Sequence, residues 1–290
     1  MDFTENESAL VVAKSFETTS DLRLRELLQG LVHHLHAYVR EARPTMAEWE
    51  AAIAFLTETG QTCSDARQEF ILLSDVLGVS MLIETINGAD ARAAEGATAS
   101  TVLGPFHMTG SPRRNLGDTL YPGRDSDVCV IEGRVVDTAG RPVAGAVLDV
   151  WQADDKGFYD VQQPDVQPPG AGRGIFAADP GGCFWFRTVT PCHYPIPTDG
   201  PVGKLLGVTG RHPYRPAHVH FIVDAPGHER LTTHVFVAGS EYLDSDAVFA
   251  VKHGLVRGFQ RIEDPAEAAR YDVVAPFTLA RFDIVLGGQP

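Results

Sequence analysis

The chain has 290 residues but only four cysteines, and no two of them form a C-x-x-C pair. We therefore expect free thiols at all four: Cys63, Cys129, Cys183 and Cys192. Basic residues are also scarce, because 24 Lys and Arg face 38 Asp and Glu, giving a formal net charge of -14. Since nucleic acids and anionic lipids attract positive charge, this balance argues against a general electrostatic attraction to either.

Long apolar runs are missing as well. No uncharged apolar stretch approaches the roughly 18 residues that a membrane helix needs, and the first segment, MDFTENESAL, lacks the basic and apolar regions of a signal peptide. We expect a cytoplasmic protein that acts on small molecules, with no nucleic-acid or membrane partner. Hydrophobic residues make up 44% of the chain, enough for at least one large core.

The first third of the chain has the apolar spacing of α-helices, from about residue 22 to residue 95. The first helix repeats leucine every three or four positions: Leu24, Leu27, Leu28, Leu31 and Leu35. The same spacing continues at 53–56 and over 70–86. This part of the sequence therefore predicts three helices.

Local signals mark the ends of these helices. The Arg-Pro pair at 43–44 predicts the end of the first helix, and Thr45 followed by Glu48 predicts a capping box for the second. The Asn-Gly pair at 87–88 predicts the end of the third. We expect a helical domain over residues 1–100.

Beyond about residue 103, Gly, Pro and Asp separate short β-branched runs. A Gly-Arg-Pro turn at 140–142 and an Asp-Pro-Ala-Glu helix cap at 264–267 interrupt this pattern. Strands are expected at 128–136, 143–151, 183–189, 218–223, 231–237 and 277–285. The sequence thus predicts a mainly β chain, with an antiparallel β-sandwich domain over residues 101–290.

The segment RHPYRPAHVHF contains a candidate metal site. Alternation along a strand places His218 and His220 on one face, about 7 Å apart, so both imidazoles can reach one ion. An H-x-H pair alone is weak evidence, because most are surface or hydrogen-bonded core histidines. No H-E-x-x-H motif or cysteine cluster stands nearby, and a zinc hydrolase would need a carboxylate such as Asp224.

Two tyrosines stand out near the predicted strands. Tyr159 follows Lys-Gly-Phe directly after the second strand, and Tyr194 lies in PCHYPIP, where prolines stiffen the loop. Either could equally be a half-buried aromatic residue with a hydrated hydroxyl.

Together these segments resemble the intradiol ring-cleaving dioxygenases, non-haem ferric enzymes that include catechol, chlorocatechol and hydroxyquinol 1,2-dioxygenases. The resemblance extends from the helical region through LGPF, AVLDVWQADDKGFYD, YPIPTDGPVGKLLG, RHPYRPAHVHF and LTTHVFV. It implies Fe(3+) held by four ligands: Tyr159, Tyr194, His218 and His220. It also implies a β-sandwich catalytic domain, a homodimer formed through the N-terminal helices, and a phospholipid bound at that helical interface.

These residue types suit ferric iron, a hard cation that favours phenolate oxygen and can deprotonate a tyrosine. Two phenolates and a bound hydroxide balance the charge of the ion, so no organic cofactor is needed. One tyrosine, which we take to be Tyr194, then serves as ligand and general base. Arg215 falls at the position of the family's arginine, which stabilises negative charge on the ring, although a surface ion pair is its alternative. His234 stands where relatives usually have glutamine.

The resemblance also assigns a mostly apolar substrate pocket, suited to a flat aromatic ring. Its members are Leu72, Asp75, Val102, Gly104, Pro105, Phe106, Ile196, Pro197 and Val248. Burying Asp75 without a partner would cost several kcal/mol, and a third ring hydroxyl would be such a partner. Catechol enzymes tend to have an apolar residue there.

We therefore expect hydroxyquinol (benzene-1,2,4-triol) as the substrate and 3-hydroxy-cis,cis-muconate, whose keto form is maleylacetate, as the product. Three alternatives stay open at this point. Asp75 could instead act as a cap or pair with Arg67 or another base, the substrate could be catechol or chlorocatechol, and a sandwich domain could be a carrier or binding module without catalysis.

Overall fold

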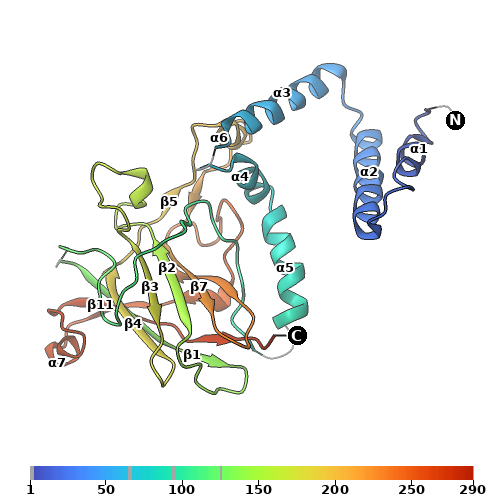
Figure 1. Ribbon diagram of the computed structural model, residues 1–290. Helices are drawn as coiled ribbons and strands as arrows, with labels where there is room; N and C mark the ends of the chain where they lie inside the picture. Colours follow the sequence, from blue (N-terminus) through green and yellow to red (C-terminus); the bar gives the residue numbers. More distant parts are fainter. Residues whose placement is uncertain (1–2, 65–66, 93–95, 125, 290) are drawn as a thin grey trace. The chain divides into compact units, whose positions relative to one another are not determined.

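Figure 1 shows the computed structural model, which describes residues 3–64, 67–92, 96–124 and 126–289. The chain divides into two compact units, Met1–Glu58 and Thr59–Pro290. The first unit is helical, and the second contains further helices and all of the described strands. The prediction of an N-terminal helical region followed by a sheet-rich region is therefore confirmed.

The first unit holds two helices and most of a third: α1 (Ser8–Lys14), α2 (Leu22–Ala42) and α3 (Met46–Thr62). Helix α1 packs against α2, where Gln29 Nε2 donates to the carbonyl of Ala13 at 3.0 Å. The predicted leucine repeat lies on α2, and Leu27, Leu31 and Leu35 are about half exposed in the single chain.

The predicted end of α2 and the predicted start of α3 are confirmed. Helix α2 ends at Arg43, whose backbone is left-handed (φ 51°) directly before Pro44. The amide of Thr45 donates to Glu48 Oε2 at 2.7 Å, and the amide of Glu48 donates to Thr45 Oγ1 at 3.3 Å. These reciprocal bonds form the capping box that the sequence predicts.

The third predicted helix is in fact two helices, α4 (Glu69–Val76) and α5 (Val79–Arg92). The break falls at Gly78, whose φ of +72° leaves the helical region. The predicted end at Asn87-Gly88 is wrong, because α5 continues through it. Asn87 Nδ2 donates to the carbonyl of Ile83 at 2.8 Å, so its side chain bonds within the helix and does not cap it.

The second unit contains two five-stranded sheets and a short two-stranded one. The first sheet has the order β3 (Arg173–Ala177), β2 (Val147–Gln152), β7 (His218–Asp224), β8 (Leu231–Val237) and β9 (Val256–Arg257). The second has the order β10 (Phe259–Ile262), β11 (Phe277–Arg281), β1 (Val128–Asp137) and β12 (Ile284–Leu286), with β4 (Cys183–Val189) also paired to β1. The short sheet joins β5 (Tyr194–Pro195) and β6 (Tyr214–Arg215).

The sheets are mixed, which corrects the expectation of purely antiparallel pairing. Strand β1 runs parallel to β11 and β12, and β8 runs parallel to β9, whereas the other strand pairs are antiparallel. Side chains of both large sheets share one apolar core, as where Phe184 and Phe186 meet Phe221. This packing of sheet on sheet is the predicted sandwich.

Strand β7 contributes side chains to both faces of its sheet. Val219, Phe221 and Val223 belong to the core between the sheets. Alternation therefore turns His218 and His220 to the opposite face, which carries the candidate site.

The remaining predictions differ from the structure mainly at element ends. Strand β2 begins only at Val147, because residues 143–146 form a turn closed by the Ala146 amide and the Val143 carbonyl. The last predicted strand is interrupted at Asp283, whose Oδ1 accepts the amide of Arg134 on β1 at 2.9 Å.

Four short helices complete the second unit: η1 (Asp160–Gln162), α6 (Pro201–Val208), η2 (His253–Leu255) and α7 (Pro265–Ala269). The cap predicted for α7 is confirmed, because Asp264 Oδ1 accepts the amide of Ala266 at 2.9 Å. None of the helices in the described part of the chain has the length and apolar character needed to cross a membrane.

Candidate metal centre and substrate pocket

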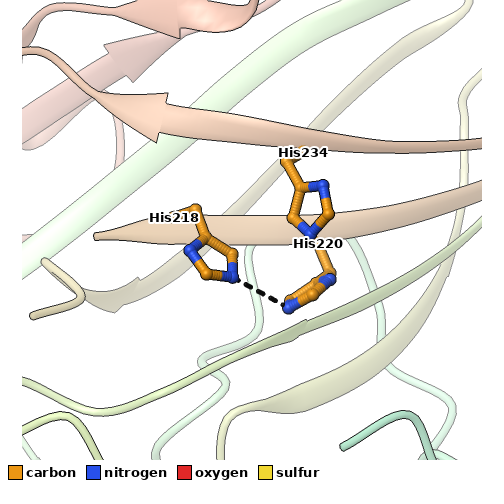
Figure 2. Close-up of side chains that lie close together, drawn as sticks. All are labelled: His218, His220 and His234. Carbon is orange, nitrogen blue, oxygen red and sulfur yellow. Dashed lines mark hydrogen bonds between the residues drawn. The ribbon is translucent and has the colours of Figure 1, made fainter. Parts of the chain in front are cut away.

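Three buried histidines gather on one face of the β7–β8 pair. His220 and His234 are direct cross-strand neighbours, and His218 lies two residues along the same strand. Their ring centroids are 4.1 to 4.8 Å apart, and each residue is at most 1% exposed. Figure 2 shows the Nε2 atoms of His218 and His220 facing one another at 3.0 Å.

The two predicted tyrosine ligands reach the same point from separate segments. Tyr159 follows a turn in which Asp154 Oδ1 accepts the amides of residues 156 and 158, and Tyr194 begins strand β5. Tyr159 Oη lies 3.1 Å from His220 Nε2, and Tyr194 Oη lies 3.4 Å from His218 Nε2. The two phenol oxygens are 3.3 Å apart. The structure thus brings all four predicted ligands together.

The protonation states of these four groups fit a bound cation. The Nδ1 atom of His218 lies 2.7 Å from the carbonyl of Pro216 and must donate to it, which leaves Nε2 as a bare lone pair. Burial lowers the pKa of His218 and His220 well below the ordinary imidazole value, and their neighbouring positive groups lower it further. Burial also raises the pKa of Tyr159 and Tyr194. The Nε2 atoms of two neutral imidazoles therefore lie 3.0 Å apart. Neutral imidazole nitrogen is the form that binds a metal ion, so a cation fits at this point.

His234 lies against this cluster. Its Nδ1 forms a short hydrogen bond with Thr101 Oγ1. Its buried Nε2 has no hydrogen-bond partner among the residues that the structure describes. Burial lowers the pKa of His234 as well, so this third imidazole is neutral.

Arg215 is buried beside the same atoms. Its Nη1 lies 3.2 Å from His218 Nε2 and 3.5 Å from Tyr194 Oη. The alternative of a surface ion pair is wrong, because Arg215 is only 1% exposed and pairs with the buried Asp246. Burial alone would lower the pKa of Arg215, but the attraction of Asp246 and the nearby tyrosines raises it above its usual value.

Asp224, the carboxylate that a zinc hydrolase would require, does not join the site. It is the last residue of β7 and is exposed. Within the described ranges, the candidate metal-binding group consists of His218, His220 and His234 and contains no carboxylate.

A cavity of about 640 Å³ reaches the candidate metal ligands through Gly104, which lines it and lies against His220. Four of the nine predicted pocket residues line it: Asp75, Val102, Gly104 and Pro105. Polar neighbours that the sequence did not suggest also line it: Gln68, Ser74, Ser80, Glu84 and His107. A side chain on Gly104 would lie 2.9 Å from His220 Cε1, so this cavity wall touches the candidate metal ligands.

The other five predicted pocket residues lie outside the lining of this cavity. Leu72, Ile196 and Val248 are buried in the main core. Phe106 stacks on Tyr159 at 4.5 Å between ring centroids, and Pro197 is half-buried. Their assignment to a substrate pocket stays a prediction.

Asp75 is a buried carboxylate in this largely apolar wall, with 3% exposure. Burial raises its pKa, while a hydrogen bond from Ser80 and the charge of Arg215 lower it in part. Arg67 does not pair with it, because the Arg67 guanidinium bonds Glu69 at 2.9 Å and Asp199 at 2.8 Å. The proposed pairing of Asp75 with Arg67 is therefore wrong.

Comparison with known proteins shows similar enzymes that cover most of the chain. Residues 104–288 match the family Dioxygenase, and residues 21–95 match Catechol dioxygenase N terminus. Hydroxyquinol 1,2-dioxygenase of Rhizobium sp. (strain MTP-10005) is 49% identical over 92% of this chain and 89% of its own length. The enzyme of the same name from Nocardioides simplex is 48% identical over 95% of this chain and 92% of its own.

A solved structure is similar over the whole length. Hydroxyquinol 1,2-dioxygenase from Pseudomonas putida DLL-E4 superposes with a TM-score of 0.90 at 46% identity. The superposition covers 98% of this chain and 99% of that one.

Proposed function

Since this chain belongs to the intradiol ring-cleaving dioxygenases, we propose that it opens hydroxyquinol with dioxygen between the two adjacent hydroxylated carbons. The product is 3-hydroxy-cis,cis-muconate, whose keto form is maleylacetate. One observation carries the proposal: the four convergent donor atoms lie beside a cavity whose lining of apolar and polar side chains contains one buried carboxylate, Asp75.

We propose Fe(3+) as the metal and Tyr159, Tyr194, His218 and His220 as its ligands. The phenol oxygens and Nε2 atoms of these residues lie 3.0 to 3.4 Å apart, which supports a shared ion. When bound, ferric iron supplies the Lewis acidity that deprotonates the phenols and the diol and makes the ring reactive toward dioxygen.

The chain's own residues then manage protons and charge. Tyr194 accepts a substrate proton at Oη, so it is both ligand and general base. Arg215 Nη1, 3.5 Å from that oxygen, stabilises negative charge on the ring as oxygen attacks. His234 keeps Nε2 available beside His220 to hydrogen-bond a reacting group. Phe106 fixes the Tyr159 ring by stacking on it.

Asp75 selects the substrate in this proposal. A carboxylate that is 3% exposed needs a donor, and the third hydroxyl of hydroxyquinol provides one that catechol lacks. The same group disfavours the chlorine substituent of a chlorocatechol at that position, because chlorine does not donate a hydrogen bond. Catechol and chlorocatechol are the alternative substrates.

We propose further that residues 1–100 form the dimerisation domain and residues 101–290 the catalytic domain. The half-exposed leucines of α2 support a surface for a second copy of the chain. A phospholipid at the helical interface of the homodimer is part of this proposal.

Product analysis under ¹⁸O₂ tests the function. We expect one molecule of 3-hydroxy-cis,cis-muconate per molecule of dioxygen, with both labelled atoms in the product. Metal analysis of the same active sample should give iron; zinc without iron in an active sample would point to a different reaction. Tight binding of hydroxyquinol without ring opening would identify a binding module.

A further inference from the structure

We infer that Asp246 is a positioning residue for the ring-opening reaction: it fixes Arg215 in the site and joins it to the chain segment that contains Val248. This inference rests on the proposed function, and it concerns a residue whose hydrogen bonds, in the described part of the chain, go to Arg215 and to backbone amides, and which does not line the cavity next to the candidate ligands. The sequence gives it no special status, because it is one of several acids in EYLDSDAVF.

The geometry of the pair determines which nitrogen of the arginine enters the site. Arg215 Nε lies 3.1 Å from Asp246 Oδ1, and Arg215 Nη2 lies 3.3 Å from Oδ2. These two bonds form a planar fork, so the guanidinium cannot rotate without losing one of them. Nη1 is the remaining nitrogen, and it faces His218 Nε2 and Tyr194 Oη.

The carboxylate is itself held from the opposite side. Asp246 Oδ1 accepts the amide of Val248 at 3.3 Å, and Oδ2 accepts the amide of Ala250 at 3.1 Å. Each oxygen therefore receives one backbone donor and one guanidinium donor. The orientation of Arg215 is thus set by the backbone of 246–250, and Val248 is a predicted pocket residue.

A second arginine ties this segment to the helix that carries Asp75. Arg211 donates from Nη2 to the carbonyl of Ala247 at 3.0 Å and from Nη1 to the carbonyl of Val76 at 2.6 Å. Val76 directly follows Asp75 in α4. The backbone that orients Arg215 is therefore braced against the helix that we propose selects the substrate.

Burial makes the pair interdependent. The side chains of Arg215 and Asp246 are 1% and 2% exposed, so removing either one leaves a buried charge without its ion-pair partner. Without Asp246, the guanidinium has no fixed orientation, and Nη1 no longer holds its place beside Tyr194. Asp246 therefore acts through Arg215 and not on the substrate.

A double-mutant cycle with Asp246→Asn and Arg215→Met tests the inference. In iron-loaded protein, Asp246→Asn alone should lower kcat for hydroxyquinol by about tenfold to a hundredfold, the size expected when a charge-stabilising donor is misplaced. In the Arg215→Met background, the same change should alter kcat by less than about twofold. Equal losses of kcat in both backgrounds would overturn the inference.

The matched control is Asp137→Asn. Asp137 Oδ1 accepts two amides, those of Ala139 and Arg141, and its Oδ2 accepts Arg141 Nε, so this aspartate also holds an arginine and the amides two and four residues further on, but in a turn. This variant should keep kcat within about twofold of the wild type, because Arg141 is 79% exposed and an ion pair with so exposed a partner contributes little.

Thermal unfolding of the metal-free proteins supplies a readout that does not need activity. The fall in Tm of the double variant should be clearly smaller than the sum of the two single falls, because removing both partners leaves no unpaired buried charge. If Asp246→Asn does not fold, recovery of folding in the double variant is the same coupling. Additive losses of Tm would overturn the inference. If the wild type does not cleave hydroxyquinol, the proposed function is wrong. The Tm values of the four proteins still show whether Asp246 and Arg215 depend on one another.

Discussion

Replacing Asp75 with leucine should remove the preference for hydroxyquinol over catechol. The carboxylate is 3% exposed in a largely apolar wall, so the third ring hydroxyl gains a hydrogen bond to a charged group there. Such a bond contributes about 1.5 to 3 kcal/mol, which corresponds to a factor of about 10 to 150 in relative kcat/KM. Leucine also removes the cost of burying a carboxylate, so kcat/KM for catechol should stay equal or rise.

The assay is competition between hydroxyquinol and catechol in one reaction, with both products measured by chromatography. Ser80→Ala is the graded control, because Ser80 donates a hydrogen bond to Asp75 and also lies on the cavity wall. Ser80 acts on the third hydroxyl only through Asp75, so its loss should change the substrate ratio less, by about twofold to tenfold. If Asp75→Leu leaves the ratio of the two kcat/KM values within about twofold of the wild type, the proposed role of Asp75 is wrong.

Two further predictions concern stability. Burial lowers the pKa of His218, His220 and His234 in the folded state, so the unfolded chain binds more protons in acid. The metal-free protein should therefore lose stability as pH falls below about 6.5, by at most about 1.4 kcal/mol per pH unit for each histidine. His234→Gln should make this slope shallower in urea titrations, and an unchanged slope would refute the assignment. Gly104→Ala should lower both Tm and metal content, because φ is +81° and the new Cβ would meet His220 at 2.9 Å. Gly239→Ala (φ +78°, open space) is the control, and equal metal loss in both would count against a specific contact.

Much of the local structure could be predicted from the sequence because its causes are local. The alternation of 218–223 predicted both the strand and the shared face of two histidines, and Thr45 with Glu48 predicted a helix start. The errors arise where a distant or competing contact determines where a helix or strand ends. Gly78 breaks a continuous apolar pattern, and Asn87 bonds within its helix instead of ending it.

The site was only partly accessible from the sequence. The pairing of β1 with β11 joins residues nearly 150 positions apart, and no local signal encodes that distance. Asp246 is 31 residues from Arg215 and lies in a loop with other acids, so its partner is visible only in the fold. The ligand set and the pocket residues were predicted from the resemblance to a family. Only the structure shows that the four ligands lie together and that four of the nine pocket residues line one cavity.

The visible absorption of the iron-loaded protein tests the central claim most directly. Tyrosinate bound to ferric iron is red through charge transfer from ligand to metal, so the wild type should be coloured, and its band should shift when hydroxyquinol is added without oxygen. Tyr194→Phe should weaken and shift the band, because only Tyr159 would then supply a tyrosinate, and it should lose the activity while remaining folded. An iron-replete but colourless wild type, or a Tyr194→Phe variant with an unchanged band and full activity, would contradict a ferric site built from these tyrosines.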